Sequence, residues 1–117
     1  MPNPTEIRYD RNEKQLAILF EDGSRFEFPA EFLRVESPSA EVRGHSPDQR
    51  VLVSGKRHVG IDRILPVGHY AIRLEFDDGH DSGIYSWDYL FGLGREQRLL
   101  WTAYLDHLTQ AGLSRDP

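Results

Sequence analysis

The sequence DDGHD at residues 77–81 places one histidine among three carboxylates. An imidazole beside carboxylates can bind a metal ion, act as a general base or complete a polar turn. Aspartates beside a turn glycine usually bond the backbone of the turn itself. No activated nucleophile or electrophile can be identified next to Asp77, Asp78 or Asp81. We therefore predict no catalytic residue here and a polar turn role for His80.

A second histidine offers a metal site as an alternative. His45 lies in the Ser-, Pro- and Gly-rich stretch 36–60, and a His80–His45 pair completed by a carboxylate such as Asp81 would suit a weakly held divalent ion. Metal sites usually need three or four donors, so the first prediction is that the protein uses no cofactor and no metal. The alternative is a metal-responsive protein that binds zinc or another divalent ion through His80 and His45.

One basic stretch and one aromatic pair are candidates for contact with another protein. The sequence GKRHVG at 55–60 carries Arg57 and His58. Such a run is usually a solvated loop, although it could dock an acidic partner. Trp101 and Tyr104 belong to a predicted helix that is apolar over more than one face, so the helix either packs on two surfaces or meets another chain. These four residues form the candidate interaction surface.

Composition limits the classes of protein that this chain can be. It has 117 residues, 38% of them hydrophobic and 28% charged, with a formal net charge of −5 and no cysteine. The negative charge argues against nucleic acid as the main partner. The lack of thiols excludes disulfides, thiolate zinc sites and an iron–sulfur cluster held by this chain's own cysteines. No apolar run is long enough for a signal peptide or a membrane span, so we expect no membrane partner and a cytoplasmic protein.

Residues 15–28 predict a β-hairpin. A two-residue turn would mix polar and apolar side chains on one face. A three-residue loop ending at Gly23, in the left-handed conformation, pairs Ile18 with Phe26 and gathers the apolar side chains on one side. We expect this second register, followed by a short helical turn at 29–33.

The same pattern returns about 56 positions later in the sequence AIRLEFDDGHDSGIYSWDYL at 71–90. A bulge at Gly83 would take up one added residue and keep Tyr85 on the buried face. The stretch therefore predicts a second hairpin followed by a second helical turn. The matched residues are Leu16 and Ile72, Ile18 and Leu74, Phe20 and Phe76, Asp22-Gly23 and Asp78-Gly79, Phe28 and Tyr85, Leu33 and Leu90.

The remaining segments complete the predicted fold. Residues 95–112 predict a helix with an apolar stripe, and we expect the tail after it to be frayed. RVLVSG at 50–55 is a candidate edge strand, and IDRILPVG at 61–68 is a candidate strand interrupted by a proline. We predict one α+β domain over 1–117. It is β-rich, with two pseudo-repeated hairpin-plus-helical-turn units and a C-terminal α-helix.

Two stretches resemble a known family, the gamma-butyrobetaine hydroxylase N-terminal-like domains. They are DGSRFEFPAEFLRVESPSAEVRGH at 22–45 and VGHYAIRLEFDDGHDSGIYSWDYLFGLG at 67–94. The resemblance covers a core of about 5–94, and residues 95–113 are read as a helical extension. Members of the family occur as free-standing bacterial proteins, which this chain resembles. They also occur fused to Fe(II)/2-oxoglutarate hydroxylases and to P-loop ATPases that carry iron–sulfur clusters.

The resemblance also implies a former zinc site. In the hydroxylase branch the module is similar to a zinc domain with a Cys-x-Cys-x-x-Cys run and a histidine. By position these ligands fall on Ser37, Ser39, Val42 and His80. Serine oxygen is a poor zinc ligand at neutral pH and valine has no donor atom. The implied site is therefore degenerate and retains only its histidine.

These observations lead to one expected function. We predict a non-enzymatic accessory module that binds an unknown protein partner, and the resemblance implies a link to iron–sulfur or 2-oxoglutarate oxygenase systems. Weak homo-oligomerisation through the C-terminal helix is a further prediction.

Overall fold

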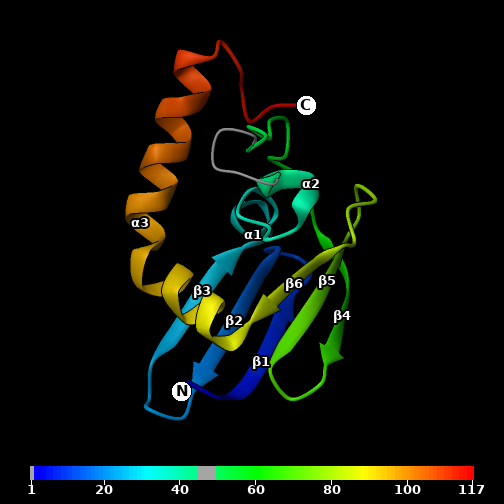
Figure 1. Ribbon diagram of the computed structural model, residues 1–117, viewed down its shortest axis with the longest axis vertical. Coiled ribbons are helices and arrows are strands. Elements are labelled where there is room, and N and C mark those ends of the chain that lie inside the picture. The colour runs from blue at the N-terminus through cyan, green and yellow to red at the C-terminus, as the bar shows by residue number, and fades with distance from the viewer. Residues whose placement is uncertain (1, 45–49) are drawn as a thin grey trace.

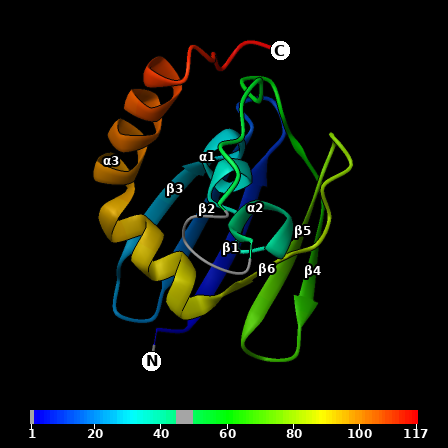
Figure 2. The same cartoon turned by 45° about the horizontal axis from the view of Figure 1, so that its top comes forward.

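Two antiparallel sheets of three strands each form the framework of the computed structural model, which describes residues 2–44 and 50–117 (Figure 1). The strand orders are β1-β2-β3 and β4-β5-β6. The sheets share one hydrophobic core, and helices follow the last strand of each (Figure 2). The predicted α+β class with a C-terminal helix is confirmed. The elements are β1 Pro4–Asp10, β2 Gln15–Phe20, β3 Arg25–Pro29, α1 Ala30–Val35, α2 Ala40–Arg43, β4 Ile61–Val67, β5 Ala71–Phe76, β6 Gly83–Ser86 and α3 Trp87–Gln110.

The first hairpin has the predicted register. Ile18 pairs with Phe26 and Leu16 with Phe28. The Phe20 N–H donates to the Ser24 carbonyl at 2.8 Å, and Gly23 has a φ of +89°. Because strand side chains alternate, this register turns the apolar side chains of β2 toward the core.

The second hairpin repeats the first, with one difference from the prediction. Phe76 and His80 close the turn as Phe20 and Ser24 do. The β5–β6 pairing is regular from Leu74–Gly83 onward, so the added residue lies at 81–82 and the predicted bulge at Gly83 is wrong. The prediction that Tyr85 lies on the buried face is confirmed, because this residue is fully buried.

The strand β1 was not predicted. Most of its residues are polar, and only Ile7 and Tyr9 of this strand pack against the core. The strand sequence therefore lacks a strong alternation of apolar and polar residues. The strand β4 retains Pro66, which an edge strand tolerates because one side of its backbone makes no ladder bonds. Residues 50–55 form no strand, and the edge strand expected there is wrong.

Helix α3 begins at Trp87 rather than at residue 95. The Ser86 side chain caps it by accepting from the Tyr89 N–H, which is the usual role of serine at this position. Leu93 is buried and Gly94 lies against the Phe26 ring. The helix therefore runs without a break from the core into its later turns, which stand at the edge of the molecule (Figure 1). No helix in the described ranges is both long and apolar enough to cross a bilayer.

The C-terminal tail is held in place, contrary to the expected fraying. The Gly55 and Arg57 N–H groups donate to the Ser114 and Arg115 carbonyls, each at 2.9 Å. The Arg115 guanidinium makes two bonds to the buried Glu31 carboxylate, at 2.6 and 2.8 Å. The tail thus ties the end of α3 to α1.

Candidate functional site

The His80 side chain is buried, with 3% of its surface exposed. Its Nε2 lies 2.8 Å from the Ser37 Oγ, and its Nδ1 lies 2.9 Å from the Glu41 Oε2. A carboxylate accepts from an N–H, so Nδ1 donates to Glu41, and Nε2 shares the second hydrogen bond with the serine hydroxyl. The turn histidine therefore connects the second hairpin to the segment after α1.

The implied former ligand positions cluster around this histidine. Ser37 lies two positions after the end of α1, and its Oγ accepts from the Ser39 N–H at 3.3 Å. The Ser39 side chain caps α2 and lies 2.7 Å from the Ser82 Oγ. Val42 is buried in α2, and its N–H donates to the Ser39 carbonyl at 3.0 Å. Ser37 is thus hydrogen-bonded to both His80 and Ser39. Val42 lies about one turn after Ser39 in α2.

The carboxylate on His80 is Glu41, which the sequence reasoning missed. Asp81 is exposed, and its carbonyl accepts from Arg73. Glu41 lies 39 positions before His80 but only two after the capping Ser39, where an acidic residue suits the start of a helix. A cap serine followed by glutamate was the available signal, although it points to a helix start and not to a histidine partner.

Asp78 holds the turn in place. Burial alone would raise its pKa, but hydrogen bonds from Lys56, the His80 N–H and Arg34 outweigh this effect and lower the pKa to about 2. The bonding distances to its carboxylate are 2.6 Å from Lys56 and 2.8 Å from Arg34. Asp78 is therefore an ionised anchor, in agreement with the predicted turn role and not with general base catalysis.

The order Ser37–His80–Glu41 matches the connectivity of a serine–histidine–carboxylate triad. Ser37, however, is 0% exposed, so its oxygen lies beneath the surface. Tyr85 lies nearby, also fully buried, and donates to the Leu33 carbonyl at 2.5 Å. The contacts form a polar network that is buried at Ser37 and His80, is exposed at Glu41, and connects three chain segments.

The surroundings of His80 offer few donor atoms to a metal ion. Both ring nitrogens of His80 already have partners. Within the part of the chain that the structure describes, no three His, Cys, Asp or Glu side chains gather in a way that could hold an ion. His45, the second donor of the metal alternative, lies outside the described residues, so the His80–His45 site stays a prediction.

The four candidate surface residues have different environments. Arg57 bonds Asp116 at 2.5 Å and His58 is exposed. Trp101 is half-buried between Phe32 and the Arg115 guanidinium. Tyr104 is buried and donates to the Val53 carbonyl at 2.7 Å; burial, with the nearby Glu31 charge, raises its pKa to about 12. The structure therefore does not bring these residues together as one exposed surface.

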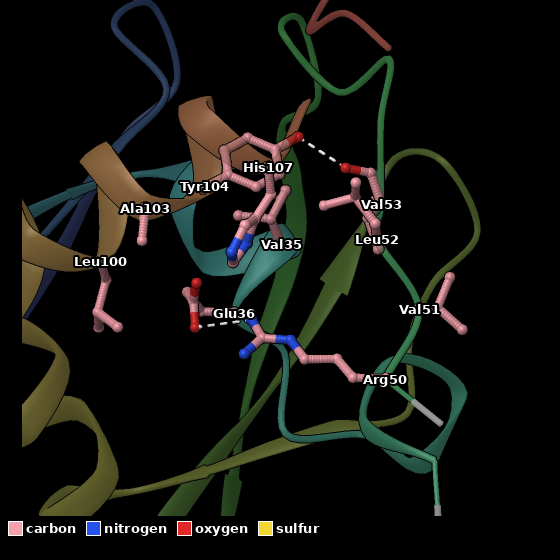
Figure 3. A pocket seen from close by; sticks show the side chains of 10 residues that line it. All are labelled: Val35, Glu36, Arg50, Val51, Leu52, Val53, Leu100, Ala103, Tyr104 and His107. Atoms are coloured by element: carbon pink, nitrogen blue, oxygen red, sulfur yellow. Dashed lines mark hydrogen bonds and ion pairs between the residues drawn. The ribbon is translucent and has the colours of Figure 1, made fainter. Parts of the chain in front are cut away.

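An open hollow of about 260 Å³ lies between α3 and residues 50–53 (Figure 3). Its walls are mainly apolar. On its floor the Glu36 carboxylate, 5% exposed, pairs with Arg50 at 3.2 Å and with Arg43 at 3.3 Å. The lining residues are Val35, Glu36, Arg50, Val51, Leu52, Val53, Leu100, Ala103, Tyr104 and His107.

A second hollow of about 310 Å³ extends this one toward the start of α3. The two share Glu36, Arg50 and Leu100. Together they form one groove along α3, which we call the α3 groove. No residue of the former zinc positions lines it.

Comparison with known proteins agrees with the fold and with the motif positions. Two solution NMR structures are 47% and 48% identical to this chain, with TM-scores of 0.87 and 0.86; each match covers 100% of this chain and 92% or 87% of the other. A crystal structure of a protein of unknown function from the DUF971 family of Acidithiobacillus ferrooxidans is 38% identical, with a TM-score of 0.67 over 79% of this chain and 92% of that one. No curated protein matches the sequence at a significant level.

The family match covers the sheets, the former zinc positions and the first turns of α3. The family model described as gamma-butyrobetaine hydroxylase-like, N-terminal, matches residues 7–91. These residues include all of the first stretch that carried the resemblance, and all of the second except for positions 92–94. The chain therefore belongs to the gamma-butyrobetaine hydroxylase-like N-terminal domain family.

Proposed function

We propose that this protein is a non-catalytic accessory module that acts by binding another protein in the α3 groove. The observation that carries the proposal is the buried Ser37–His80 contact at the former zinc positions. Ser37 and His80 are buried and bonded to each other, so the family's metal position has become structural. The α3 groove, by contrast, is open to solvent and lined by apolar side chains around a charged floor.

The groove suits a partner segment that carries an aliphatic side chain next to a carboxylate. The aliphatic side chain would pack against Val35, Leu52 and Leu100, which line the hollow. The carboxylate would pair with Arg50, whose side chain is 42% exposed beside the buried Glu36. Burial of an apolar anchor with a charged contact at its rim is the usual energetic pattern of such interfaces.

Two finer points belong to the same proposal. Family membership supports a partner in a 2-oxoglutarate oxygenase system, because the family is described by its place in a hydroxylase; the alternative of an iron–sulfur system rests on the family resemblance of the sequence. A cytoplasmic location is consistent with the charged composition of the chain.

Site-specific photo-crosslinking in the native cell tests the binding surface. A photoreactive amino acid at Ala103, in the groove, should give a discrete adduct, whereas one at the exposed Glu13 on the β1–β2 turn should not. A Leu52→Asp change in the Ala103 variant should remove the adduct, provided that circular dichroism shows an intact fold. Equal adducts from both positions would contradict the groove as the binding site.

The non-catalytic part has its own test. Purified wild-type protein should show no turnover of ester, amide and thioester substrates, and no labelling of Ser37 by a fluorophosphonate probe. Turnover that disappears in both the Ser37→Ala and the His80→Ala variants would show that the network is catalytic.

A further inference from the structure

The second half of α3 presents one continuous exposed face. Residues in a helix turn by about 100° per position, so the seven residues of this face lie within about 60° of Thr102. The opposite side of the helix carries Tyr104 and Leu108, which pack in a small apolar cluster with Val35. The members of the exposed face are Arg95, Arg98, Leu99, Thr102, Leu105, Asp106 and Thr109.

Two leucines on this face are open to solvent. Leu99 is 70% exposed and Leu105 is 36% exposed. The turns that carry them stand at the margin of the molecule in both views, with no other described element on their outer side (Figures 1 and 2). The fold thus covers one side of the helix, whereas the other side carries these two leucines at its edges and polar or charged residues between them.

The face is self-complementary about Thr102. Leu99 and Leu105 lie three positions before and after it, and Arg98 and Asp106 lie four positions before and after it. In an antiparallel pair of such helices with a two-fold axis at Thr102, each residue lies level with the one equally far on the other side. Arginine then faces aspartate twice near the middle of the face, and the leucines lie along its two edges.

We infer that this face binds a second copy of the chain as an antiparallel α3 pair centred on Thr102. Charge complementarity selects the arrangement. A parallel pair would set Arg98 beside its own copy, and an axis moved one turn toward the N-terminus would set Arg98 against Leu99. Thr102, at the axis, is small enough to let the two helices approach.

The expected dimer is weak and concentration-dependent. One face of the second half of α3 buries less surface than a stable interface needs, and its ion pairs involve exposed side chains. This self-association uses the side of α3 opposite the α3 groove. Self-association can therefore be tested separately from the proposed function.

A charge swap tests the register. Arg98→Asp or Asp106→Arg alone should weaken self-association by about tenfold, because each change places like charges together twice. The double variant Arg98→Asp/Asp106→Arg should return to near the wild-type value. Positions 98 and 106 are about 12 Å apart along one helix, so the rescue cannot arise within a single chain. Sedimentation equilibrium up to millimolar protein measures all four forms.

A disulfide test uses the absence of native cysteine. Under mild oxidation, Thr102→Cys should form a covalent dimer, because the two copies of this position meet at the axis. Arg95→Cys, on the same face, should not, because its two copies lie about 21 Å apart. A wild-type protein that remains monomeric at millimolar concentration, a double charge variant no better than the single ones, or equal cross-linking at both cysteines would overturn the inference.

Discussion

The Ser37 Oγ and the His80 Nε2 lie 2.8 Å apart, although 43 positions separate the two residues in the chain. Serine stands at a position that the family resemblance assigns to a cysteine ligand, and the histidine has been retained. The hydrogen bond joins the two segments directly. Its partners are the Glu41 carboxylate on the other ring nitrogen and the Ser39 N–H on the serine oxygen.

Restoring the three cysteines should restore metal binding. The variant Ser37→Cys/Ser39→Cys/Val42→Cys offers three thiolates near His80, a donor set typical of structural zinc sites. We expect about one Zn²⁺ per chain by elemental analysis of protein without a His-tag, and no zinc in the wild type. Adding His80→Ala to the triple variant should weaken the binding by removing the fourth ligand. A folded triple variant that takes up no zinc would show that these positions do not converge closely enough.

Two glycines of α3 should respond in opposite ways to alanine. At Gly92 an added Cβ meets nothing within 4 Å, whereas at Gly94 it would lie 2.3 Å from the Phe26 ring. Gly92→Ala should raise the free energy of unfolding by about 0.5–1 kcal/mol, because alanine favours the helix. Gly94→Ala should lower it by about 1–3 kcal/mol through overpacking. Urea denaturation followed by circular dichroism measures both, and a similar change in the two variants would contradict the contact.

Asp78 should make stability depend on acid pH. Its folded pKa is about 2, below the usual value of 3.8, so its ionised form is favoured in the folded state. This contribution is fully present above about pH 4 and is lost as the pH falls toward 2. Asp78→Asn should remove about 1–2 kcal/mol of unfolding free energy at neutral pH, and less at low pH. Denaturant titrations at pH 7 and pH 2.5 compare the two proteins, and an equal loss at both would contradict the assignment.

The C-terminal tail should contribute to stability through Arg115. Its guanidinium makes two bonds to Glu31, whose side chain is 6% exposed. Arg115→Ala leaves this buried carboxylate unpaired and should cost about 2–4 kcal/mol of unfolding free energy. Asp116→Ala removes the neighbouring pair with Arg57, which is more exposed, and should cost less than about 1 kcal/mol. Equal effects in thermal unfolding would show that the tail is held by its backbone bonds alone.

The hairpins could be predicted from sequence because their determinants are local. Alternating apolar residues, one glycine at a left-handed position and a loop of fixed length specify the register at Ile18–Phe26. The repeat then predicted the second hairpin and the burial of Tyr85. The strand β1 escaped prediction because only Ile7 and Tyr9 reach the core from it, and a strand with so few buried positions lacks a readable alternation.

The family and the motif positions were also determined by the sequence itself. The two stretches at 22–45 and 67–94, with the spacing from Leu33-Arg34 to the second Asp-Gly-His, were enough to identify the resemblance, which the family match over residues 7–91 confirms. It could not identify Glu41 as the histidine's partner, because that contact depends on how the second hairpin lies against α2 and not on any local pattern.

Long-range packing decided the rest. Only the folded chain buries Ser37 completely, lays the tail along residues 55–57, and covers one side of α3 while leaving Leu99 exposed. Each of these outcomes arises when segments far apart in the sequence exclude water together. Local propensity and spacing carry no information about which segments will meet.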